Sequence, residues 1–84
     1  MELDVLVNGV QSRHDLVAFI DALRGDLAAN DSAWENPTLD RYLAALAAWT
    51  NDMDGYFHNQ GQDVPPEPTW QLIAAMLYAA HLYE

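Results

Sequence analysis

The sequence predicts a small, mainly α-helical protein: a three-helix bundle with a short extended arm or strand at its N-terminus. Three segments repeat apolar residues at helical spacing, each begins near a residue that caps helices, and 84 residues suffice for one domain only. We expect a single domain over 1–84. Its parts are an arm (1–11), a first helix (12–30), a second helix (36–52), a packed loop (53–68) and a third helix (69–83).

The N-terminal arm is predicted from residue types. Val5 and Val7 are β-branched, and Asn8-Gly9 is typical of a tight turn. Because two strands alone are only marginally stable in water, we expect the arm to pack on the helices or to pair with the arm of a second copy.

The first helix has the clearest signals. Ser12 is a favoured N-cap, and Asp15, three residues later, matches a variant of the capping box. Apolar residues then recur at helical spacing: Leu16, Phe19, Ile20, Leu23 and Leu27. This pattern predicts an amphipathic helix with one buried stripe.

The second and third helices are apolar on more than one face. In the second helix, Asn36 is expected to cap and Pro37 to occupy the first helical position. A bundle of three helices can enclose one helix but not two. The face of the third helix that carries Leu72, Met76 and Tyr83 therefore needs a cover, supplied by the loop, by a second copy or by a different protein. The pattern favours a homo-oligomer, in its simplest form a dimer, or a stable protein partner.

The chain is strongly acidic. It has 13 carboxylates, three arginines and no lysine, which gives a net charge of −10. Three arginines cannot neutralise a phosphate backbone, so direct nucleic-acid binding is excluded. The carboxylates either keep the surface solvated or attract a basic protein, and Asp15, Asp26 and Glu35 are the candidates for the second role.

Motifs for catalysis and cofactor binding do not occur in the sequence. It contains no nucleotide-binding glycine loop and no nucleophile elbow, so we expect no enzyme, no catalytic residue and no cofactor. The segment 52–55 is similar to the start of a calcium loop, but the last loop position falls on Gly61, where a glutamate is needed. A helix end followed by a turn is the favoured interpretation. Asp52, Asp54 and His58 are weak metal candidates only.

The sequence lacks the patterns typical of membrane-spanning and secretory segments. No apolar run approaches the roughly 20 residues of a membrane span. The first thirty residues carry no basic region followed by an apolar core. We expect no signal peptide, no membrane association and, since the sequence has no cysteine, a cytoplasmic protein.

Several blocks together carry a family resemblance. They are Trp34-Glu35-Asn36, Asp52-Met53-Asp54-Gly55-Tyr56 and Pro68-Thr69-Trp70. In these blocks the sequence resembles, from about Ser12 to Glu84, a family of short bacterial proteins described as a domain of unknown function. The resemblance implies kinship and a mainly helical fold, and it implies no activity.

The same blocks have two physical interpretations. In the first, Trp34, Trp49 and Trp70 anchor the loops to the helices. In the second, the polar residues of the blocks converge as a patch: Glu35, Asn36, Asp52, Asp54, Tyr56 and Asn59. Convergence would require the loop to run back along the bundle.

The function predicted from all of this is non-catalytic binding. We expect a small acidic protein that binds another macromolecule, in its most concrete form an antagonist or immunity-type protein that blocks a basic protein target. One alternative is a structural homo-oligomer without a basic target. A less favoured alternative is a small metal-binding sensor or enzyme.

Overall fold

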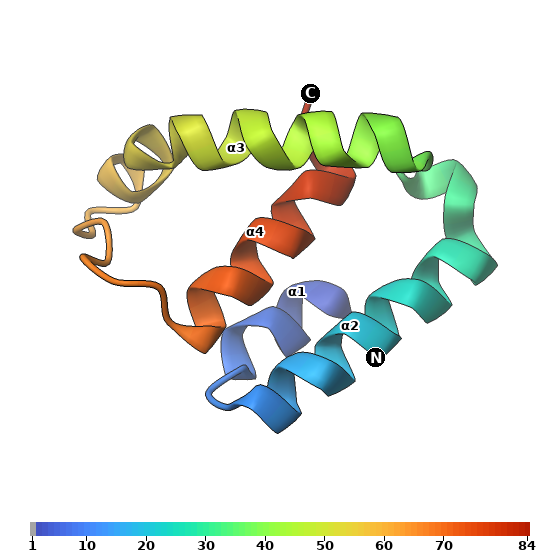
Figure 1. Cartoon of the computed structure of the whole chain (residues 1–84), viewed down its shortest axis with the longest axis horizontal. Helices are drawn as coiled ribbons and strands as arrows, with labels where there is room; N and C mark the ends of the chain where they lie inside the picture. Colours follow the sequence, from blue (N-terminus) through green and yellow to red (C-terminus); the bar gives the residue numbers. More distant parts are fainter. Residues whose placement is uncertain (1) are drawn as a thin grey trace.

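The structure, a computed structural model, describes residues 2–84, and every regular element in this range is helical (Figure 1). Within this range the α-helices are α1 (Leu3–Leu6), α2 (Arg13–Asn30), α3 (Leu39–Asn59) and α4 (Trp70–Leu82), with 3-10 turns η1 (Val7–Gly9) and η2 (Asp31–Ala33). The predicted small, mainly α-helical fold is confirmed. None of the helices described is both long and apolar enough to cross a membrane.

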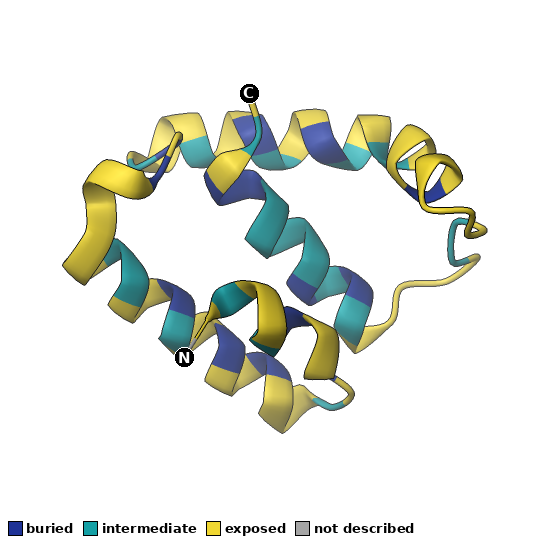
Figure 2. Cartoon of the chain, turned by 180° about the vertical axis from the view of Figure 1, so that it is seen from behind, coloured by how far each residue is buried: buried dark blue, intermediate teal, exposed yellow. Residues whose placement is uncertain are grey.

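Helix α4 is the central element. In Figure 1 it runs diagonally between α3 on one side and α1 and α2 on the other, and it packs on α3, α2 and η1. Figure 2 shows buried and half-buried residues along its length, whereas much of α2 and α3 is exposed. Helices α2 and α3 thus pack chiefly on α4 and not on each other.

This arrangement corrects the prediction that one face of the last helix lacks cover within the three-helix bundle. Leu72 is only 4% exposed, and Met76 and Tyr83 are half-buried, within a chain whose α3 lies against α4. At Tyr83 the cover comes from α3, where Asp52 accepts a hydrogen bond from the Tyr83 hydroxyl at 2.6 Å. Other large apolar residues remain exposed. They are Val5, Val17, Ile20, Leu39, Leu43, Tyr56, and Trp70 and Leu82 at the two ends of α4.

The main hydrophobic core lies between the N-terminal segment, α2 and α4. Its buried members are Val7, Val10, Leu16, Phe19, Leu23, Trp34 and Ala74. The predicted stripe of the first helix is confirmed at Leu16, Phe19 and Leu23, whereas Ile20 is 37% exposed. Full burial of a large apolar side chain stabilises a fold by about 1.5–3 kcal/mol, so this cluster dominates the stability of the small domain.

The prediction of an extended conformation for the N-terminal arm is wrong. Residues 2–11 form α1, η1 and the link to α2, and no strand occurs among residues 2–84; Met1 lies outside the described residues. The apolar residues of this segment, Leu3, Leu6, Val7 and Val10, follow helical spacing. Helical folding therefore buries Val7 and Val10 in the core, while residues 2–84 contain no strand with which this segment could pair.

Helix α3 is longer than predicted. It runs through the expected turn after residue 52 and ends at Asn59. There the amides of Gly61 and Gln62 donate to the carbonyls of His58 and Phe57 at 3.0 and 2.9 Å, which is a Schellman motif. Gly61 has φ of 69°, a conformation that glycine adopts without a steric penalty.

The helix starts agree with the sequence in two cases of three. Ser12 caps α2 and Thr69 caps α4, each accepting a hydrogen bond from the backbone N–H three residues on, at 3.1 and 3.0 Å. The predicted cap of the second helix is wrong, since Thr38 caps α3, which begins at Leu39. Asn36 is instead buried and bonded to α4.

Candidate functional site

An apolar groove opens between α2 and the N-terminal end of α3, with Leu77 of α4 contributing to its lining. Its volume is about 380 Å³, within the roughly 300–1,000 Å³ typical of ligand sites. The lining residues are Ile20, Leu23, Arg24, Leu27, Trp34, Asn36, Pro37, Thr38, Leu39, Tyr42 and Leu77. Arg24 is the charged member of this set, and it forms an exposed 3.3 Å ion pair with Asp21.

Two aliphatic residues of the groove are exposed to solvent. Leu39 is 73% exposed. It is the first residue of α3, and the buried face of this helix begins further along, at Ala45 and Trp49. Ile20 follows the core residue Phe19 in α2 and is therefore turned out of the core. Removing such apolar surface from water is favourable by about 25 cal/mol per Å², so the groove gains free energy from an apolar occupant.

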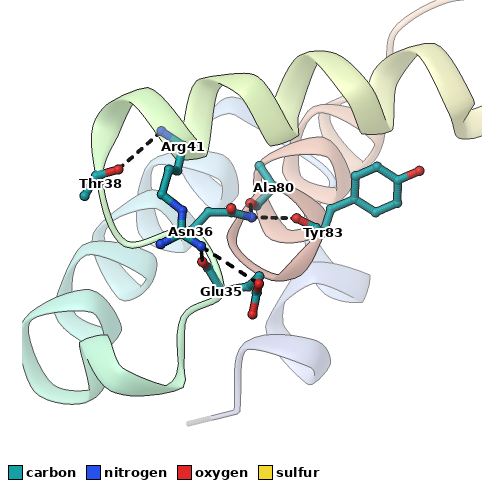
Figure 3. A network of polar contacts seen from close by, with 6 residues as sticks. All are labelled: Glu35, Asn36, Thr38, Arg41, Ala80 and Tyr83. Atoms are coloured by element: carbon teal, nitrogen blue, oxygen red, sulfur yellow. Dashed lines mark hydrogen bonds and ion pairs between the residues drawn. The ribbon is translucent and has the colours of Figure 1, made fainter.

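The segment between η2 and α3 is fastened to the end of α4. Asn36, 7% exposed, donates through its side-chain amide to the carbonyls of Ala80 and Tyr83 at 3.0 and 2.6 Å (Figure 3). The backbone N–H groups of Glu35 and Asn36 donate to the carbonyl of His81 at 3.1 and 3.3 Å. The last carbonyls of a helix have no partner within it, so this segment acts as the C-terminal cap of α4.

A second set of contacts fixes Trp34, which forms part of the groove wall. Its indole N–H donates to the Asp26 carboxylate at 2.8 Å, and its ring lies 6.0 Å from that of Tyr42 and 4.8 Å from that of His81. The hydrogen bond from Trp34 lowers the pKa of Asp26, outweighing the opposing effect of desolvation. The wall is thus held before any ligand arrives, which reduces the ordering cost of binding.

Tyr42 joins α3 to α4 at the floor of the groove. Its hydroxyl donates to the carbonyl of Leu77 at 2.8 Å, and burial raises the pKa of Tyr42 to about 12. An unfolded tyrosine titrates near pH 10, so the folded state holds this proton more tightly. The stability linked to the proton is complete below about pH 10 and is lost as the pH rises to about 12.

We therefore expect Tyr42→Phe to lose less of its stability than the wild type between about pH 10 and 12. Denaturant unfolding at several alkaline pH values measures the difference. Tyr56→Phe is the matched control, because Tyr56 lies on the same helix but is 46% exposed. An equal alkaline loss in Tyr42→Phe and wild type would contradict the assignment.

The residues predicted as an interaction surface differ in their exposure. Leu72 is buried, and Met76 and Tyr83 are half-buried. Of the acidic candidates, Asp15 and Glu35 are exposed and Asp26 is half-buried. Asp15 accepts from the backbone N–H of Gln11 at 3.0 Å, and Glu35 lies 3.9 Å from Arg41, so both also have local structural partners.

The weak metal candidates lie on α3. Asp52 accepts a hydrogen bond from the Tyr83 hydroxyl at 2.6 Å, which raises the pKa of Tyr83. Among residues 2–84, Asp52, Asp54 and His58 do not belong to any group of three or more side chains able to hold a metal ion. Of the suggested polar patch, Asn36 and Asp52 are linked, through the carbonyl and the hydroxyl of Tyr83.

The aromatic anchors divide into two kinds. Trp34 and Trp49 are 8% and 6% exposed, as expected of anchors, whereas Trp70 is 43% exposed. The groove itself was missed at the level of the sequence. Its one available signal was the Asn36-Pro37-Thr38 break, which separates α2 from α3 and lets the two helices diverge.

The fold and the groove define a small helical domain with an apolar concavity between two helices that pack on a third. The chain belongs to a family of unknown function, DUF7660, whose model matches residues 12–84. The kinship expected from the tryptophan and Asp-Met-Asp-Gly-Tyr blocks is thereby confirmed. No curated protein and no solved structure matches the chain.

Proposed function

We propose that this protein is a non-catalytic binding module for a basic protein partner, and that the groove between α2 and α3 receives an apolar segment of that partner. The observation that carries this function is the groove itself, with Leu39 and Ile20 exposed at a preformed, largely apolar concavity. Exposed apolar surface gathered in one place is typical of interaction sites. Recognition of an amphipathic segment in such a groove relies on a few apolar anchors.

The charge of the chain indicates the chemistry of the partner. A net charge of −10 attracts basic surfaces at long range and repels acidic ones. The partner segment is therefore apolar where it enters the groove and basic around it. The absence of cysteine is compatible with action in the reducing cytoplasm.

The most specific form of this function is antagonism. An acidic module that covers the active surface of a basic enzyme, such as a nuclease, would act as an immunity-type protein. Inhibition assays on basic nucleases test this form separately, since binding without inhibition would leave the module a simple adaptor.

Variants of two leucines test the groove. Leu39→Ser is expected to weaken binding of the basic partner by at least about tenfold, because Leu39 is an exposed apolar anchor of the groove. Leu82→Ser is the matched control, since Leu82 is 46% exposed and lines no described groove. Affinity capture from the host, followed by calorimetry on the captured protein, gives the comparison.

Equal affinities of the two variants, or an acidic captured partner, would contradict the proposal. Far-UV circular dichroism checks that both variants are folded. Folded variants are expected, because surface substitutions change the free energy of unfolding by only about 0.5 kcal/mol.

The second candidate is a structural homo-oligomer, in its simplest form a dimer. It is favoured by Leu39 and Leu43, which lie one turn apart on α3 and are 73% and 51% exposed. Self-association brings together two chains of −10 each, which opposes it at low salt. Light scattering separates the two functions, because a monomer at micromolar concentration excludes the homo-oligomer.

A further inference from the structure

A second concavity lies where α1 and η1 meet α3 and α4. Its volume is about 280 Å³, and it shares no lining residue with the groove between α2 and α3. Three aromatic residues line it, Trp49 and Tyr56 from α3 and Tyr78 from α4, together with the carboxylate residue Asp4 of α1. Four chain segments thus converge on one small aromatic pocket.

The aromatic rings are arranged around the pocket and not stacked on one another. The ring centroids of Trp49 and Tyr56 are 5.5 Å apart, with planes inclined by 57°. Trp49 is 6% exposed and therefore held in place by its neighbours, whereas Tyr56 is 46% exposed. The face of an aromatic ring carries negative potential, and rings that do not stack leave faces that a cation can approach.

The charged group at the pocket is negative, as is the potential at the faces of the aromatic rings. Asp4 belongs to its lining, and α1 is tied down by the Asn8 side chain, which donates to the Asp4 carbonyl at 3.1 Å. Burial, together with the nearby carboxylates of Asp4 and Glu2, raises the pKa of Tyr78. No arginine lines the pocket, and the three arginines of the chain fall between residues 13 and 41.

We propose that this aromatic pocket binds an alkylated ammonium group, with the faces of Trp49, Tyr56 and Tyr78 around the cation and the Asp4 carboxylate beside it. A cation over an aromatic face is stabilised by the ring quadrupole, and quaternary ammonium ligands suit such cages because they are weakly hydrated. Val7, Ala75 and Ala79 line the rest of the pocket together with Asn8 and Gln71, and the three apolar residues match alkyl substituents.

The ligand chemistry has two sources, a free quaternary ammonium compound or a methylated lysine side chain of a protein. Heteronuclear NMR titrations with choline and with a short peptide carrying trimethyllysine distinguish them. Tighter binding of the peptide assigns the side chain as ligand, and binding no tighter than that of choline assigns the free cation. Either result supports the pocket, provided that the indole N–H resonance of Trp49 shifts.

The controls separate charge from shape. Dimethylbutanol, the neutral isostere of choline in which carbon replaces nitrogen, should produce no saturable shift at the concentrations at which choline does. Asp4→Asn and Tyr56→Leu should weaken choline binding by about threefold to tenfold. Asp63→Asn, which changes an exposed acid in the loop before α4, should bind as the wild type does.

Absence of binding by choline and by the peptide, or equal binding of the neutral isostere, overturns the proposal. The titration uses the isolated full chain and no basic protein partner. The pocket and the groove between α2 and α3 can therefore fail independently.

Discussion

Phe19→Ala is expected to lower the free energy of unfolding by about 3–5 kcal/mol, a large part of the stability of a domain of this size. Phe19 is 1% exposed and belongs to the core formed by the N-terminal segment, α2 and α4. Truncation removes most of a buried ring and leaves a cavity that the surrounding helices can fill only partly. Urea or guanidinium unfolding followed by tryptophan fluorescence measures the loss.

The same helix supplies the control for this variant. Val17 is 54% exposed, so Val17→Ala should change stability by no more than about 0.5 kcal/mol. Phe19→Leu keeps most of the volume and should cost less than Phe19→Ala, which leaves a measurable variant if the alanine form does not fold. A Phe19→Ala protein as stable as Val17→Ala would show that the ring is not in the core.

The second large effect is expected at Asn36. Asn36→Ala should lower the free energy of unfolding by about 2–4 kcal/mol, because the carbonyls of Ala80 and Tyr83 lose their donor and cannot both regain water. Asn36→Asp should be no better, although it has nearly the same shape, because a carboxylate accepts hydrogen bonds and donates none. Chemical denaturation at neutral pH measures both variants.

Asn51→Ala is the reference substitution for Asn36. The amide of Asn51 donates to Asp52 at 3.1 Å on the exposed side of α3, and such a contact contributes little. If Asn36→Asp matched the wild type at neutral pH, the fastening of the interhelix segment to α4 would not depend on amide donation.

The parts of the fold that could be predicted are those set by local signals. Ser12 and Thr69 cap helices through their own hydroxyls, and Leu16, Phe19 and Leu23 share one face by spacing alone. These features depend on a few neighbouring residues, so a sequence contains the necessary information.

The wrong predictions concern segments whose conformation depends on contacts with residues distant in the sequence. Asn36 has the side chain of an N-cap, but α4, 44 residues away at Ala80, offers its amide a buried carbonyl. Val5, Val7 and Asn8-Gly9 favour a strand locally, but a strand needs a neighbour and the helical core accepts Val7. The extra length of α3 follows from a Gly61 cap that competed with the earlier Asp-Gly signal.

The candidate sites could be predicted only in part. The sequence predicted surplus apolar surface, but it placed that surface on the last helix. Which face stays open depends on the angle at which α2 and α3 cross α4, and spacing within one helix does not encode that angle. The aromatic pocket combines Asp4, Tyr56 and Tyr78 from three separate helices, so no local motif marks it.

The central position of α4 has a consequence for how the molecule comes apart. Helices α2 and α3 are held together mainly through α4. Loss of α4 from the bundle would leave these two amphipathic helices with no helix on which both could pack. Partial opening that releases α4 is therefore nearly equivalent to global unfolding. Its amides should belong to the slowest-exchanging cooperative unit, while the Gln60–Thr69 connection opens independently.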